Sequence, residues 1–154
     1  MPTVFDGLIF IALLSASMLA GLMVALLTVM RKVWARQDEA TAAHSFKEFL
    51  TQAARNRVLS TLSVLPIVCP LIAVFCRPGR SGQLKFALAG CGIFLLGFYV
   101  WTGLINLPIY RAVDRWDLTK TPDNVRTYLR RFHTANIVRL GALICASALF
   151  FAAS

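Results

Sequence analysis

Acidic side chains are scarce in this chain. Its 154 residues include seven Asp and Glu but sixteen Lys and Arg, which gives a formal net charge of +9. None of the seven lies in the four long apolar stretches, at about 7–30, 58–76, 86–109 and 134–153. A basic residue inside one of these stretches therefore has no carboxylate in any of them to pair with. This excludes a simple ion pair buried among the stretches.

Paired cysteines and charged surface are also lacking. The four cysteines, Cys69, Cys76, Cys91 and Cys145, lie in or beside the apolar stretches and form no CxxC motif. Their placement favours small buried thiols, and the missing motif argues against a membrane thiol oxidoreductase of the quinone-coupled type. Charged residues make up only 15% of the chain, against about 25% in soluble domains. A soluble globular domain is therefore excluded.

The chain is instead rich in hydrophobic residues, and they form long apolar stretches. Hydrophobic residues make up 58% of it, and the mean hydropathy is +0.68. A helix needs about 20 apolar residues to cross ~30 Å of hydrocarbon, so the four stretches predict four spans. We expect one all-α domain over 1–154, an integral-membrane four-helix bundle whose helices 1, 2 and 4 extend past the membrane on the cytoplasmic side. The first stretch is not expected to be a cleaved signal peptide, because no basic residue precedes it.

Basic residues are distributed unevenly among the connections between the apolar stretches. Thirteen of the sixteen fall in 31–57 and 110–139, and only three fall in 77–85. The positive-inside rule places the two basic connections in the cytoplasm and both termini outside. We therefore expect a plasma (inner) membrane protein whose basic face meets anionic lipid. Nucleic acid is not an expected partner, because the charge flanks spans and no nucleic-acid fold signature is present.

Local patterns predict further details. Residues 40–57 have the spacing of an amphipathic helix, with Phe46 and Leu50 on its apolar face, and this helix is expected to run into the second span. Thr121 and Pro122 predict the start of the last helix. Small residues in the third span predict close approach of a neighbouring helix. They are Gly90, Gly92, Gly97 and Gly103.

Polar side chains gather where the third span ends and the fourth begins. The run that follows Arg139 supplies about 21 Å of helix, which is too short to cross the hydrocarbon, so Arg139 should lie inside it. Asn106 lies at a similar depth on the antiparallel neighbour, and His133, Asn136 and Arg139 recur every three residues along one helix face. A buried guanidinium needs partners. We expect the two Asn side chains, freed backbone carbonyls near Pro108, or an anionic ligand group such as a phenolate, enolate or lipid phosphate to supply them.

Less specific interpretations of these residues stay open. Arg139 can extend to the lipid headgroups while Asn106 caps the end of a span. His133 can be an interfacial polar residue and not a base. His44 and Glu48 are spaced to share a metal ion on one helix, but no third ligand is in view, so no metal is expected.

Two motifs resemble those of the anthrone-oxygenase-like family, which consists of small four-span membrane proteins, many of unknown function. The first is INLPIYRAV at 105–113, in an Asn-x-Pro form, which Trp116 follows. The second is RFHTANIVR at 131–139, in an Asn-x-x-Arg form. The specific motifs cover only the last third of the chain, and the resemblance extends loosely to the whole four-span layout. The basic segment 31–36 is also similar to one in the membrane glutathione-transferase superfamily, but that superfamily's acidic residue in the second span is not matched.

The resemblance implies an oxygenase or related oxidoreductase that needs no metal or organic cofactor and acts on a lipophilic phenolic or polycyclic substrate. It makes His133 the candidate base. The implied anion stabilisers are Arg139, Asn106 and Asn136. The expected substrate contacts are Trp101, Tyr110 and Phe132. Fungal members carry a Pro-Phe-Thr element that reads differently here, so the resemblance implies the reaction class and not anthrone itself. The alternative function is a non-catalytic membrane accessory or lipid-binding subunit.

Overall fold

The computed structural model describes residues 3–76 and 81–154, and this part of the chain is helical with no β-strand. Four of its helical segments are long and apolar enough to cross a membrane: Val4–Arg36, Arg57–Cys76, Gly82–Asp114 and Val125–Ala153. They match the four predicted spans. The chain therefore fits an integral membrane protein.

The first long segment is a continuous rod made of α1 (Val4–Ala25), the π-helical turn η1 (Leu26–Met30) and α2 (Arg31–Arg36). A capping box opens it: the backbone N–H of Asp6 donates to Thr3 Oγ1 at 3.3 Å, and the backbone N–H of Thr3 donates to Asp6 Oδ2 at 2.8 Å. These bonds satisfy backbone donors that a helix start leaves without partners.

The amphipathic helix is confirmed as α3 (Glu39–Arg55), which buries Phe46 and Leu50. It does not run into the second span, however, because Asn56 is extended with ψ 109° and separates it from α4 (Arg57–Cys76). The side chain of Asn56 then caps α4 by accepting the backbone N–H of Leu59 at 3.1 Å. An Asn that bonds to the backbone two or three residues ahead favours such a break.

The third long segment contains two π-helical turns. It consists of α5 (Ser81–Phe94), the π-helical turns η2 (Leu95–Val100) and η3 (Thr102–Asn106), and α6 (Leu107–Asp114). The last helix, α7 (Val125–Ala153), begins after the predicted start at Thr121 and Pro122, which lie in the preceding loop. Asn124 has a left-handed φ of 67° and turns the chain into α7. An Asn tolerates this conformation better than most residues, and this displaces the helix start.

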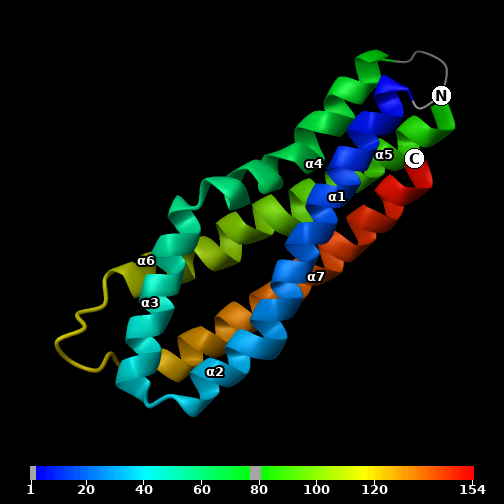
Figure 1. The fold of residues 1–154 in the computed structure, drawn as a ribbon. Helices are drawn as coiled ribbons and strands as arrows, with labels where there is room; N and C mark the ends of the chain where they lie inside the picture. The colour runs from blue at the N-terminus through cyan, green and yellow to red at the C-terminus, as the bar shows by residue number, and fades with distance from the viewer. Residues whose placement is uncertain (1–2, 77–80) are drawn as a thin grey trace.

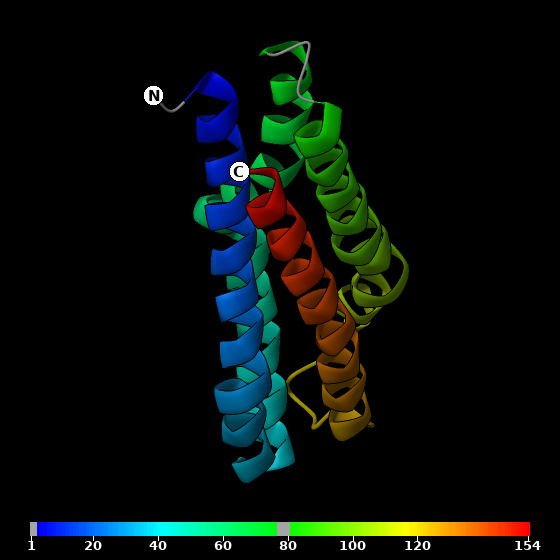
Figure 2. The ribbon, with the colours of Figure 1, turned by 90° about the vertical axis from the view of Figure 1, so that its right-hand side faces the viewer.

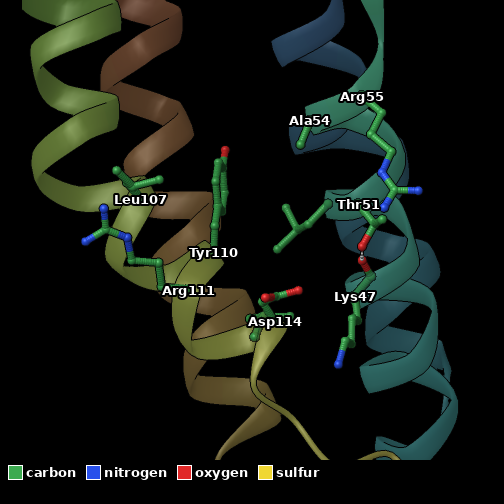
Figure 3. A pocket seen from close by; sticks show the side chains of 10 residues that line it. Lys47, Thr51, Ala54, Arg55, Leu107, Tyr110, Arg111 and Asp114 are labelled. Atoms are coloured by element: carbon green, nitrogen blue, oxygen red, sulfur yellow. Dashed lines mark hydrogen bonds between the residues drawn. The ribbon is translucent and has the colours of Figure 1, made fainter.

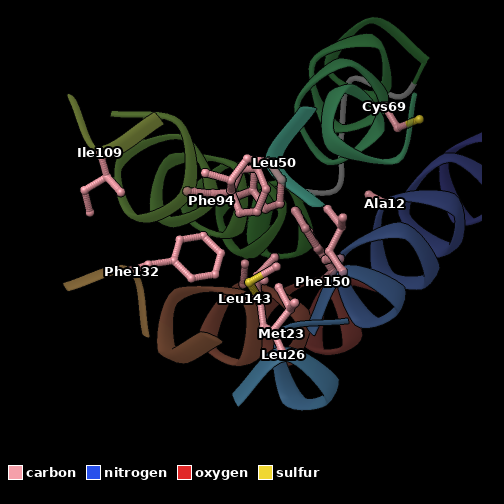
Figure 4. Packing of buried hydrophobic residues seen from close by; sticks show 14 of the residues in the cluster. Ala12, Met23, Leu26, Leu50, Cys69, Phe94, Ile109, Phe132, Leu143 and Phe150 are labelled. Atoms are coloured by element: carbon pink, nitrogen blue, oxygen red, sulfur yellow. The ribbon is translucent and has the colours of Figure 1, made fainter. Parts of the chain in front are cut away.

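The helices pack side by side in a bundle (Figures 1 and 2). Both ends of the chain lie near the end of α4 and the start of α5, whereas the α2–α3 and α6–α7 connections lie at the opposite end (Figure 1). The helix α1 packs against α4 and α7, and α5 packs against α7. Figure 4 shows the buried core between them, which includes Met23, Phe94, Leu143 and Phe150.

Two of the four glycines in the third long segment make the predicted close approach. A Cβ atom added at Gly97 would overlap the Cβ of Ala142, and one at Gly90 would lie 2.8 Å from the Phe150 ring. Added Cβ atoms at Gly92 and Gly103 would meet nothing within 4 Å. Of these four glycines, Gly90 and Gly97 are therefore the two that lie on the face of α5 and η2 that meets α7.

Candidate functional site

Arg139 of α7 turns its side chain into the bundle, with only 8% of its surface exposed. Its Nη1 donates to Asn136 Oδ1 at 3.0 Å. The guanidinium carbon lies 4.2 Å above the centre of the Phe98 ring in η2, which is cation–π geometry. A guanidinium held away from water in this way needs compensating contacts, and it has an amide and an aromatic face but no carboxylate among the residues of its pocket.

Asn106, the last residue of η3, lies against Asn136 from the antiparallel helix. Both side chains are fully buried. The Nδ2 atom of Asn106 donates to Asn136 Oδ1 at 3.5 Å, so this one oxygen faces both Asn106 and Arg139. The structure thus brings together three of the four residues that were expected to form the catalytic group.

Several polar atoms of this trio have no partner. Asn106 Oδ1, Asn136 Nδ2 and Arg139 Nε are buried without a hydrogen bond. An unpartnered buried donor or acceptor costs about 1–3 kcal/mol, and native structures contain few of them. Three such atoms on adjacent side chains are typical of a site that accommodates a water molecule or a ligand.

A pocket of about 230 Å³ opens beside the guanidinium. Leu19, Leu22, Met23 and Leu26 line it from the first helical rod, and Phe49, Phe98, Tyr110 and Phe132 line it with aromatic rings. The phenol of Tyr110 is near enough to the guanidinium of Arg139 to interact with it electrostatically. An apolar pocket with one fixed cation and few polar groups is the usual form of a small-molecule site.

The backbone of the third long segment positions this arrangement. The turns η2 and η3 carry Phe98 and Asn106, and π-helical turns occur frequently at functional sites. The hydroxyl of Thr102 donates to the backbone carbonyl of Phe98. Pro108, at the start of α6, has no N–H to donate to the turn before it. The irregular turns therefore coincide with a residue that cannot continue regular helical hydrogen bonding.

The three expected substrate contacts are divided between two places. Tyr110 and Phe132 line the pocket that contains Arg139. Trp101 lines a separate outer groove, and its indole Nε1 donates to the backbone carbonyl of Ala135 at 3.2 Å. Trp101 therefore ties the third long segment to α7 and does not line the Arg139 pocket.

His133 also lies apart from the Arg139 pocket. It is 7% exposed, its ring centre lies 5.6 Å from that of Trp34, and it lines a groove between α2 and α7 that includes Arg31. Its Nδ1 has no hydrogen-bond partner, nor has the buried Nε1 of Trp34. His133 shares a helix with Asn136 and Arg139 but projects toward a different neighbour.

Sequence reasoning missed several pocket residues. Phe98 was not singled out, although it packs under the guanidinium. Ser60 and Ser63 of α4, three residues apart in an apolar span, also line the pocket, and Ser63 Oγ lies 3.0 Å from the Tyr99 hydroxyl. Paired hydroxyls at helical spacing in an apolar span were a usable signal for Ser60 and Ser63. Phe98 had no such signal, because it is one of eleven phenylalanines and nothing in the sequence distinguishes it from the other ten.

A second pocket, of about 350 Å³, adjoins the first between α3 and α6 (Figure 3). The two pockets share the lining residues Leu50, Ala54 and Tyr110. Lys47 and Asp114 lie at the end of the second pocket nearer the α6–α7 connection (Figure 3). The two pockets are therefore neighbours, separated by the three shared side chains.

No cluster of three or more His, Cys, Asp or Glu side chains that could hold a metal ion is present in the ranges 3–76 and 81–154. His44 and Glu48 are both exposed on α3. Protein-family models, curated proteins and solved structures were compared with the chain, and none of them matched it.

Proposed function

We propose that this protein is a membrane-embedded oxygenase or related oxidoreductase that acts on a lipophilic phenolic or polycyclic substrate. The observation that carries the proposal is the buried Arg139 guanidinium, which lines an apolar and aromatic pocket with no carboxylate in its lining. Such a pocket favours an aromatic molecule that becomes anionic, because the ligand supplies the counter-charge that the protein lacks. The resemblance of the two motifs to anthrone-oxygenase-like proteins supports the reaction class.

The reaction would convert an activated methylene into a carbonyl. A proton leaves the methylene, and the negative charge spreads over the ring system onto an oxygen. Molecular oxygen is the oxidant: the carbanion forms a C–O bond with it and yields a hydroperoxide after protonation. Loss of water then breaks the O–O bond and the remaining C–H bond, so that CH₂ and O₂ become C=O and H₂O. The balance requires no metal or organic cofactor.

Arg139 and the two amides would stabilise the anion in this scheme. The unpartnered Asn136 Nδ2 and Arg139 Nε are donors free to meet an oxyanion, and preorganised donors of this kind each contribute about 10²–10³-fold to rate. Tyr110 is the titratable group that shares the pocket with Arg139, so we propose that it relays the proton. His133 remains the alternative base, acting from the neighbouring groove.

The same proposal includes a location and an orientation. The four apolar helices would cross the plasma (inner) membrane, with the α2–α3 and α6–α7 connections in the cytoplasm because they hold thirteen of the sixteen basic residues. α2, α3 and the start of α7 would then extend past the membrane on that side. The pocket at Arg139 would open toward the cytoplasmic leaflet.

The test is oxygen uptake by the purified protein in lipid nanodiscs, with anthrone and hydroxylated polycyclic compounds as probes and carbonyl product followed by absorbance. Arg139→Ala and Asn136→Ala should abolish turnover while the protein still inserts and elutes as one species. Arg36→Ala, an exposed arginine on α2, is the matched control and should be unaffected. Full turnover in both the Arg139→Ala and the Asn136→Ala variants would eliminate the proposed roles.

A non-catalytic accessory or lipid-binding subunit is the second candidate. One observation favours it: a buried cation in an apolar pocket also suits the phosphate or carboxylate of a lipid. Binding of a lipid that depends on Arg139, with no oxygen uptake for any aromatic probe, would support this candidate over the oxygenase.

A further inference from the structure

A groove of about 560 Å³ runs along the outside of the bundle where η3 and α6 meet α7. It shares no lining residue with the Arg139 pocket. A ligand in this groove would therefore bind independently of the proposed substrate. What we propose for the groove does not rest on the proposed oxygenase.

One end of the groove is apolar. Leu104, Ile105 and Pro108 line it, and Leu104 is 67% exposed. The hydrogen bond from Trp101 Nε1 to the Ala135 carbonyl joins the two helices across this end. The surface is thus a fixed apolar channel between two helices, open on the side that faces away from the core.

The other end of the groove is basic. Arg130 and Arg131 are exposed lining residues, and Tyr128 lies beside them. No Asp or Glu lines the groove. Two adjacent cations at the end of an apolar channel are complementary to an anion that carries a hydrocarbon chain.

The depth of the two ends agrees with such a ligand. Arg130 and Arg131 belong to the basic segment 110–139, which the positive-inside rule places at the cytoplasmic interface, whereas Leu104 and Ile105 belong to a helical segment apolar enough to cross a membrane. The arginines therefore fall at the level of the lipid phosphates, and the apolar end, beside Ala135, falls among the acyl chains. We propose that this groove binds an anionic phospholipid, with its phosphate at Arg130 and Arg131 and an acyl chain along Leu104 and Ile105.

The charge requirement is tested with the protein purified in detergent and titrated with phosphatidylglycerol or phosphatidylcholine, with bound lipid counted by native mass spectrometry. Phosphatidylglycerol should bind in preference to phosphatidylcholine. The double variant Arg130→Gln, Arg131→Gln should lose roughly tenfold or more of that affinity, since each basic residue near the headgroups contributes appreciably. The control Arg36→Gln, Arg115→Gln removes the same charge from exposed residues that line none of the pockets described above, and should retain the preference.

The acyl-chain requirement is tested with Ile105→Trp, which places a larger ring at the apolar end of the groove. This variant should weaken binding of long-chain phosphatidylglycerol while Arg130 and Arg131 stay in place. Equal losses in the groove and control arginine variants would overturn the proposal, because they would indicate a general charge effect. Displacement of the lipid by inorganic phosphate at similar concentration would also overturn it, since the site would then recognise free phosphate.

Discussion

Asn106 and Asn136 lie thirty residues apart in the chain and meet side chain to side chain, with Nδ2 of Asn106 3.5 Å from Oδ1 of Asn136. The same oxygen accepts a closer bond, at 3.0 Å, from Arg139. A donor–acceptor distance of 3.5 Å is long for an N–H···O bond, whose usual range is about 2.7–3.2 Å. The amide of Asn106 is therefore loosely held.

The first prediction concerns Asn136→Asp. The new carboxylate would lie where Oδ1 now accepts from Arg139 at 3.0 Å, so it would form a buried ion pair. Thermal stability should be retained or raised, because the guanidinium gains a counter-charge, while binding of anionic aromatic ligands should fall by roughly 100-fold or more. Isothermal titration with a polycyclic phenol and a melting curve measure the two effects. Undiminished ligand binding would show that the Arg139 charge does not hold the ligand.

The second prediction separates Tyr110 from His133. Tyr110→Phe removes the only titratable group besides Arg139 in the pocket lining and should lower turnover roughly 10²–10⁴-fold, the usual contribution of a proton-transfer group. His133→Gln alters the neighbouring groove and should change turnover far less. Single-turnover oxygen uptake compares the two variants. The opposite order would assign the base to His133.

The third prediction concerns the close contact of η2 with α7. Gly97→Ala should destabilise the protein by about 1–3 kcal/mol, because the added methyl overlaps Ala142 and forces the helices apart. Gly92→Ala, where a Cβ meets nothing within 4 Å, should stabilise it by about 0.5–1 kcal/mol, since alanine is the better helix former. Thermal unfolding in one detergent measures both. Similar melting temperatures for the two variants would contradict the close approach.

The fourth prediction concerns pH and the start of α3. The pKa of Asp38 is lowered from its ordinary 3.8, chiefly because the carboxylate accepts the backbone N–H of Thr41. A carboxyl whose pKa is depressed in the folded state stabilises that state above its unfolded pKa, and the contribution is lost as pH falls through the folded pKa. Acid titration of α3 helicity by circular dichroism should therefore show a small loss below pH 3.8 that Asp38→Asn removes. A loss of the same size in the variant would assign the effect to other carboxyls.

The residues of the chain, taken in order, were enough to predict the number of long helices and their apolar character. A run of about 20 apolar residues without a carboxylate has one low-energy solution in lipid, since every backbone polar group must be satisfied within the segment. They also predicted that Asn106 faces Asn136 and Arg139 across two antiparallel helices, and these side chains do meet. The meeting of these polar groups at one level of the bundle was therefore predictable.

Only the tertiary structure decided which way those groups point. Three-residue spacing placed His133, Asn136 and Arg139 within one broad arc of α7, but that arc meets two neighbours, so His133 packs on Trp34 while Arg139 packs on Phe98. The π-helical turns in the third long segment change its register, and so Trp101 meets Ala135 in the outer groove while Phe98 lines the pocket. Local periodicity gives the angle between residues on one helix, whereas the identity of the surface opposite them comes from packing between helices.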